Sequence, residues 1–380
     1  MSEIDAFIDL TRSIFQSKDF IGLHEPRFKG NESKYILETI NSTFVSSVGK
    51  YVDSFEESLA TYTGVPKAVA VVNGTAALHV SLNLAGVTAD TEVITQALTF
   101  VATANAISYN NAVPVFLDVD SDSMGLSPLS LTRFLETYGD IREEGTFNKA
   151  SNKRISAIVP MHTLGFIGKI DEIVAIASKW NIPVVEDAAE ALGSRFAGKH
   201  AGTFGQTSAL SFNGNKLITS GGGGAILSMD ENYAEKAKHL TTTAKQPHSW
   251  EYRHDEIGYN YRMPNLNAAL ALAQLEQVQE FIASKKTVFS AYEEELSSTF
   301  QLKKPPQDMQ WNYWLFPLEF DNRKDRDFFL EQTNRNGVMT RPIWQLMFQL
   351  PMYKDCYRDD QSNALILADT IVNIPSSARG

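Results

Sequence analysis

Val184-Val185-Glu186-Asp187-Ala188-Ala189-Glu190 places consecutive acids directly after a short apolar run. Carboxylates that follow a buried strand are costly unless a partner offsets the loss of their hydration. A protonated pyridine nitrogen is one such partner for an Asp, and a metal ion or solvent are the alternatives. Ligands of open α/β sheets bind beyond the carboxyl ends of the strands, so this stretch predicts a ligand site at a strand end.

Short apolar runs alternate with helical patterns on both sides of these acids. Strands are predicted over residues 68–72, 92–94, 113–119, 155–161, 183–187, 207–212 and 224–228. The helices between them are predicted over 75–85, from about 100, over 128–136 and over 170–180. This βαβα order predicts an α/β fold with a mainly parallel sheet and helices on both faces.

The chain is expected to divide into three parts. Residues 1–50 form an amphipathic helix and an arm, 51–262 form the large domain, and 263–380 form a long helix and a smaller domain. Pro264 is predicted to open that long helix. A strand over 315–320 and a helix near 324–336 make the smaller domain α+β, while residues 139–154 form a polar excursion on the surface.

Two further polar clusters follow predicted strands. Asn73-Gly74-Thr75-Ala76 opens a helix, where backbone amides favour a phosphate, although such a turn commonly does no more than cap a helix. Ser211-Phe212-Asn213-Gly214-Asn215-Lys216 ends in a lysine, and a lysine so placed can serve as amine nucleophile and base. The order of phosphate turn, aspartate and lysine is the one that a pyridoxal phosphate (PLP) site on this sheet requires.

Bulk composition excludes several classes of protein. A formal net charge of −11 and a pI near 5.2 argue against nucleic acid as the main partner. The single cysteine, Cys356, rules out an intramolecular disulfide, and no metal site is predicted. The chain shows neither a secretory signal nor an apolar run long enough for a membrane span, so a cytoplasmic location is expected.

With these residues together, the sequence resembles the DegT–StrS family of PLP-dependent nucleotide-sugar aminotransferases from Gly22 to about Pro375. The resemblance implies fold type I, the aspartate-aminotransferase-like fold of PLP-dependent transferases, and a homodimer with shared active sites. It also implies that Lys216 holds PLP as a Schiff base, that Asp187 pairs with its ring nitrogen and that Phe100 stacks on the ring. The other implied cofactor contacts are Gly74, Thr75, Ala76 and Ser211 at the phosphate, Glu190 near the ring hydroxyl, and Asn260 at the phosphate of the neighbouring subunit.

The chain departs from the family pattern at two places. Glu190 replaces a frequent Gln, and Gly221-Gly222-Gly223-Gly224 replaces a frequent Gly-Glu-Gly-Gly. The four glycines, with Leu23-His24-Glu25-Pro26, resemble one subgroup of the family. Its members aminate C4 of UDP-linked 4-keto-6-deoxy N-acetyl sugars on the way to bacillosamine- or legionaminic-type surface glycans.

The resemblance makes L-glutamate the expected amino donor and a nucleotide-linked keto sugar the expected acceptor. His162, Asn312 and Arg341 are the candidate contacts to the sugar or the nucleotide, and structural roles for each are equally open.

Three other functions compete with this reading. A PLP-dependent sugar dehydratase or deoxygenase shares the fold, but in those relatives a histidine typically replaces the lysine that this chain has as Lys216. A non-catalytic PLP-binding regulator would normally carry a DNA-binding domain, for which this acidic chain has no spare length. A Rossmann oxidoreductase would need Gly-x-Gly-x-x-Gly after the first strand, and Asn73-Gly74-Thr75 offers one glycine.

Overall fold

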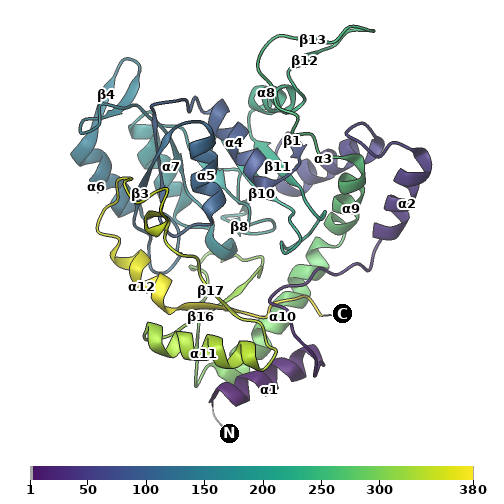
Figure 1. Ribbon diagram of the computed structural model, residues 1–380, viewed down its shortest axis with the longest axis vertical. Helices are drawn as coiled ribbons and strands as arrows, with labels where there is room; N and C mark the ends of the chain where they lie inside the picture. The colour runs from purple at the N-terminus through teal and green to yellow at the C-terminus, as the bar shows by residue number, and fades with distance from the viewer. Residues whose placement is uncertain (1–2, 380) are drawn as a thin grey trace.

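The computed structural model describes residues 3–379, which are built around one large sheet (Figure 1). The strand order is β1 (Lys67–Val71), β11 (Gly224–Ser228), β10 (Thr207–Ser211), β7 (Val185–Asp187), β6 (Ile155–Val159), β2 (Glu92–Gln96), β3 (Val113–Leu117). Parallel bridges from Ile158 to Val184 and from Met161 to Asp187 join the β6 and β7 halves of this order.

Neighbouring strands are parallel except at β11, which runs antiparallel to both β1 and β10. A parallel crossover usually needs a helix between its strands, and residues 212–223 between β10 and β11 contain none. The chain therefore turns back on itself there. The predicted α/β fold with a mainly parallel sheet is confirmed, with β11 as its reversed strand.

Helices cover both faces of the sheet, as predicted. They are α3 (Lys50–Thr63), α4 (Gly74–Leu84), α5 (Val101–Tyr109), α6 (Pro128–Tyr138), α7 (Ile170–Lys179) and α8 (Glu231–Thr241). Side chains of β1 alternate between two buried cores, because successive residues of a strand point to opposite faces. Ala68 and Ala70 lie in the core that includes α3, whereas Val69 and Val71 lie in the core that includes α4 and α8.

The C-terminal part of the chain forms a second, antiparallel sheet. Its order is β14 (Gln301–Leu302), β16 (Phe316–Glu319), β18 (Ile371–Ile374), β17 (Arg341–Pro342). Packed with it are α1 (Glu3–Phe15), α10 (Val278–Leu296), α11 (Arg323–Arg335) and α12 (Ser362–Thr370). The ring of Phe7 in α1 lies 4.9 Å from that of Phe329 in α11, so the first helix packs against C-terminal elements.

The prediction of one long helix after Pro264 is wrong. Pro264 does precede a helix, α9 (Asn265–Leu275), but this helix ends before α10 begins at Val278. At the break, the buried Gln277 turns its amide to the Glu32 carboxylate at 2.7 Å and to the Ala273 carbonyl at 2.9 Å. The break lets α9 pack on α3 while α10 packs on α1.

The remaining elements are small. They are α2 (Glu32–Ser42), the hairpin of β4 (Gly139–Arg142) and β5 (Gly145–Asn148), β8 (Arg195–Phe196), β9 (Lys199–His200), β15 (Met309–Gln310), β12 (Lys245–Gln246), β13 (Arg253–His254), and the 3₁₀ turns η1 (Thr163–Gly165) and η2 (Met347–Gln349). The β12–β13 hairpin projects from the body of the molecule (Figure 1). Within residues 3–379, no helix has the length and apolarity that crossing a membrane requires.

Candidate active site

A cavity of about 290 Å³ lies at the carboxyl ends of the central strands. It is lined by Asn73, Gly74 and Thr75 after β1, Phe100 after β2, Met161 after β6, Asp187, Ala189 and Glu190 at the end of β7, Ser211 and Lys216 at and after β10, and Trp314 and Trp344 of the C-terminal part. A larger hollow of about 460 Å³ lies between α3 and α9, away from these strand ends. The cavity therefore gathers the three polar clusters that the sequence singled out.

One end of this cavity is the start of α4. The Oδ1 atom of Asn73 accepts a hydrogen bond of 2.8 Å from the Ala76 amide and caps the helix. A Cβ atom at Gly74 would lie 2.9 Å from Cβ of Ser211, so only glycine allows this turn to approach β10. Gly74, Thr75 and Ser211 line the cavity as expected. Ala76 does not line it, and its amide is bonded to the cap, so its predicted phosphate contact stays a prediction.

Asp187 lies at the end of β7 with 3 % of its surface exposed. Its Oδ2 accepts a 2.6 Å hydrogen bond from the Thr103 hydroxyl, and its Oδ1 accepts one of 3.1 Å from the Ala189 amide. Burial raises the pKa of this carboxyl above its ordinary value, against the effect of these donors. Both donors are neutral, so a cationic group in the cavity would stabilise the ionised Asp187.

Lys216 faces the cavity from the loop after β10. Its Nζ lies 3.2 Å from Oε1 of Glu190 and 4.2 Å from the centre of the Trp314 ring. The indole N–H of Trp314 donates a 2.7 Å hydrogen bond to the Asn215 carbonyl, which fixes that ring beside the lysine. Lys216 is thus held with its amine in the cavity, 13 % exposed.

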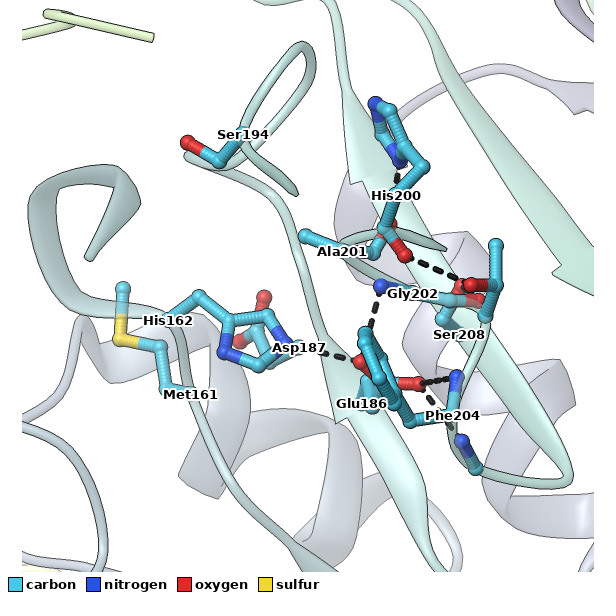
Figure 2. A network of polar contacts seen from close by, with 12 residues as sticks. Met161, His162, Glu186, Asp187, Ser194, His200, Ala201, Gly202, Phe204 and Ser208 are labelled. Carbon is cyan, nitrogen blue, oxygen red and sulfur yellow. Dashed lines mark hydrogen bonds and ion pairs between the residues drawn. The ribbon is translucent and has the colours of Figure 1, made fainter. Parts of the chain in front are cut away.

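His162, a predicted substrate contact, lies in a buried polar network with Glu186 (Figure 2). Its Nε2 lies 2.8 Å from Oε2 of Glu186. Glu186 also accepts backbone hydrogen bonds of 2.7–2.8 Å from Gly202, Phe204 and Gly205. Burial by itself raises the pKa of Glu186, but these donors outweigh it and hold the pKa below its ordinary value. Nε2 of His162 is taken by Glu186 and His162 does not line the cavity, so its role as a substrate contact stays a prediction.

The other substrate candidates also lie outside the lining. Asn312 is buried, and its amide donates to the Glu190 and Leu192 carbonyls at 2.7 and 2.9 Å, so it fixes the backbone. Its substrate contact stays a prediction. Arg341 is exposed on β17. Asn260 is exposed beside Thr242, to which it is bridged at the base of the β12–β13 hairpin, so its predicted contact with a neighbouring subunit stays a prediction.

Among the site residues that were not predicted from the sequence are Thr103, Trp314 and Trp344. Thr103 lies on the first turn of α5, within the Thr99–Thr103 segment whose aromatic Phe100 was singled out. The two tryptophans come from the C-terminal part, and the edge of Trp344 meets Phe100 with ring centres 6.4 Å apart. No local motif marks them, since they reach the cavity only through the packing of that part on the sheet.

The residues present fit PLP. The hydroxyls of Thr75 and Ser211 and the first amides of α4 suit its phosphate, because amides at a helix start lack partners within the helix. Asp187 suits a ring N–H, Phe100 offers an aromatic face, and Lys216 offers the amine for covalent attachment. The fold and the site together define a PLP-dependent enzyme of fold type I.

Comparison with known proteins gives the family. The chain belongs to the DegT/DnrJ/EryC1/StrS aminotransferase family, whose model matches residues 26–379. This confirms the resemblance drawn from the motifs, and with it PLP as the cofactor and aminotransferase as the class of enzyme.

Relatives and solved structures of similar sequence or shape cover most of the chain. The chain is 38% identical over 335 residues to a Bacillus subtilis (strain 168) protein named "Putative pyridoxal phosphate-dependent aminotransferase EpsN", covering 88% of this chain and 84% of that protein. It is 35% identical over 339 residues to the GDP-perosamine synthase of Escherichia coli O157:H7, covering 89% and 88%. Helicobacter pylori PseC, an aminotransferase of pseudoaminic acid biosynthesis, has the same fold, with a TM-score of 0.85, 24% identity and coverage of 94% and 93%.

Proposed function

We propose that this protein transfers an amino group from L-glutamate to C4 of a nucleotide-linked 4-keto-6-deoxy sugar in bacterial surface-glycan biosynthesis. The observation that carries the proposal is the position of Lys216 and Asp187 on one cavity with a helix start at its end. A lysine at this position favours an aminotransferase over a sugar dehydratase, in which a histidine is typical. The sugar-aminotransferase relatives support the substrate class.

Each side chain has a separate task in this proposal. PLP, when bound, supplies an electron sink for the charge left on a substrate carbon that loses a proton. The Asp187 carboxylate accepts the hydrogen bond of the ring N–H and keeps that nitrogen cationic. The Lys216 amine would hold the cofactor covalently, and as a free amine it would take a proton from the α-carbon of glutamate onto Nζ. Thr75 and Ser211 hold the phosphate and so fix the orientation of the ring.

For the acceptor, two nucleotides are supported by different observations. The subgroup motifs, Leu23-His24-Glu25-Pro26 and the four glycines, favour a UDP-linked N-acetyl sugar. The relatives named GDP-perosamine synthase favour a GDP-linked sugar. We take the UDP-linked N-acetyl sugar as the proposed acceptor and the GDP-linked sugar as the second candidate.

The first experiment is an absorbance spectrum of the purified protein loaded with PLP, with and without excess L-glutamate. A visible band that glutamate converts to a near-ultraviolet band is expected, and Lys216→Ala should lack the visible band. Absence of any band after PLP addition, or a band that survives Lys216→Ala, would overturn the assignment of the site. A band that glutamate leaves unchanged would overturn glutamate as the donor.

The second experiment identifies the acceptor. UDP-, GDP- and dTDP-linked 4-keto-6-deoxy sugars are added separately to the glutamate-treated protein, and return of the visible band marks the sugar that accepts the amine. Return with the UDP-linked N-acetyl sugar alone supports the proposed acceptor. Return with the GDP-linked sugar alone replaces it with the second candidate.

A further inference from the structure

Glu190 is the position at which this chain replaces a frequent Gln of its family with an acid. The two side chains have the same shape, but only a carboxyl group can take up and release a proton near neutral pH. Glu190 also touches the reactive amine, since its Oε1 lies 3.2 Å from Nζ of Lys216. The replacement therefore places a proton-carrying group beside the amine of Lys216.

The surroundings of Glu190 let its carboxyl be either protonated or ionised near neutral pH. It is 4 % exposed, and its other oxygen, Oε2, accepts a single backbone hydrogen bond of 2.9 Å, from Leu164 in η1. Burial raises the pKa of Glu190 to about 7, with the Lys216 charge and the Leu164 hydrogen bond acting against it and the Asp187 charge adding to it.

The charged groups that face Glu190 come from two elements. Asp187 lies at the end of β7, and Lys216 lies in the loop after β10. Lys216 is in turn faced by His24, from the segment before α2. Asn312, whose amide holds the Glu190 carbonyl, is neutral. Lys216 is thus the one cation among these groups that contacts Glu190 directly.

We propose that Glu190 exchanges a proton directly with Lys216 and so generates the free amine that attaches the cofactor. An N–H bond of the Lys216 ammonium breaks, an O–H bond forms at Oε1 of Glu190, and the electron pair stays on Nζ, so nothing is oxidised or reduced. The products are a neutral amine and a neutral carboxylic acid. The inference rests on the proposed function only in using Lys216 as the amine that binds the cofactor and moves the proton.

A physical argument favours this exchange in a buried site. An ammonium and a carboxylate out of water each lose hydration, and transfer of the proton replaces two buried charges with none. The net charge of the pair stays constant, so the amine forms without a proton having to reach solvent. A Gln at this position could not accept the proton.

The first test measures the proton on Glu190 itself. Infrared spectra of the full-length wild type and Glu190→Gln are subtracted across the neutral pH range, so that the C=O band of a protonated Glu190 appears in the difference. We expect this band to fall to half near pH 7. With Lys216→Met in both proteins, the midpoint should move to higher pH because the nearby cation is gone. No protonated band near neutral pH, or a midpoint that Lys216→Met leaves in place, would overturn the proposal.

The second test measures the reactivity of the amine. Full-length wild type and Glu190→Gln, each freed of cofactor, are mixed with PLP, and the rate at which the visible band forms is recorded against pH. Between about pH 8 and about pH 6 the rate should fall roughly tenfold further in Glu190→Gln than in the wild type. Each pH unit changes the unprotonated fraction of an amine about tenfold, and exchange with Glu190 spares the wild type the upper of these two units. Parallel profiles would overturn the proposal.

Two controls separate this inference from the proposed function. A single cooperative melting transition shows that Glu190→Gln is folded, and its amide oxygen can still accept the Leu164 hydrogen bond. Neither test uses glutamate or a keto sugar. A wild type whose spectrum glutamate does not change would therefore contradict the proposed function and leave the proton exchange standing. Parallel pH profiles of PLP loading would contradict the proton exchange and leave the proposed function standing.

Discussion

Glu186 and Glu190 lie four residues apart, both are buried, and each faces a basic side chain, yet their pKa values are shifted in opposite directions. Glu186 meets four donors: His162 and the amides of Gly202, Phe204 and Gly205. Glu190 meets the Leu164 amide and Lys216. The difference is the number of fixed donors that surround each carboxylate.

This contrast separates a structural acid from a reactive one. Fixed backbone donors favour the charged form of a carboxylate and cannot move away, so Glu186 stays ionised and joins β7 to the loop at residues 202–205. A carboxyl with few donors and a mobile lysine can change its proton form without loss of structure. The strand end thus carries both kinds of acid on one short segment.

The largest effect is expected for Glu186→Gln. Each oxygen of Glu186 accepts two hydrogen bonds, so an amide NH₂ in either place would face at least one fixed backbone donor and leave it unsatisfied. Loss of about 3 kcal/mol or more of unfolding free energy is expected at neutral pH, since a buried unsatisfied donor costs roughly 1–3 kcal/mol. Urea denaturation measures it, with Glu190→Gln as the matched control. Equal losses in the two variants would contradict the comparison.

The next effect is a change in how stability depends on pH. The folded-state pKa of Glu190, about 7, lies above the ordinary value of 4.5, so the folded protein binds the proton more tightly than the unfolded chain. The stability that this gives is fully present below pH 4.5 and is lost as pH rises to about 7, and Glu190→Gln removes it. The stability of Glu190→Gln relative to wild type should rise by about 3 kcal/mol across that window. Denaturation curves at several pH values test this, and a constant difference would refute it.

A smaller effect is expected for His162→Phe. The substitution removes one of four donors to Glu186 and leaves the three backbone amides in place. A loss of about 1.5–3 kcal/mol is expected, as for a hydrogen bond to a charged group. The pKa of Glu186 should rise toward its ordinary value, so that acid unfolding begins at higher pH than in the wild type. Because His162 does not line the cavity, PLP affinity measured by absorbance titration should change little, and a large loss of affinity would return His162 to the active site.

The smallest effect is expected for Trp314→Phe. This change keeps an aromatic ring beside Lys216 but removes the indole N–H that binds the Asn215 carbonyl. A loss of about 1 kcal/mol is expected from that one hydrogen bond. Thermal denaturation measures it, and Trp314→Leu, which also removes the cation–π contact, should lose about 0.5–1 kcal/mol more. No difference between the two variants would show that the ring does not stabilise the lysine.

The strand-end motifs could be predicted from the sequence because each is local. Asp187 ends one apolar strand and Lys216 lies in the loop after another, and parallel strands bring their carboxyl ends to one edge, so the pattern indicates that the two meet. Gly74 and Thr75 are recognisable for the same reason. The sheet itself followed from the alternation of strands and helices, apart from the reversal at β11.

What could not be predicted depends on contacts between distant segments. His162 follows a strand, as a ligand contact would. Only the folded structure shows that its side chain binds Glu186, which the loop at residues 202–205 also holds. The helix after Pro264 has an unbroken apolar pattern, and the break follows from Gln277 binding Glu32, 245 residues earlier. The hydrogen bond from Leu164 to Glu190 could not be predicted either, because a backbone amide donates it and a backbone amide has no sequence signature.

The reversed strand β11 also sets when this protein can fold. β1 has β11 as its sheet neighbour, and Lys67 pairs with Ser228, so the first strand made must wait for more than 150 further residues before its partner exists. At a synthesis rate of about 5–20 residues per second, that wait is roughly 8–30 s on the ribosome. For this time the apolar edge of β1 has no strand to pair with, and an unpaired edge is a site of aggregation. Expression yield should therefore depend on how the nascent chain is shielded while residues 72–223 are being made.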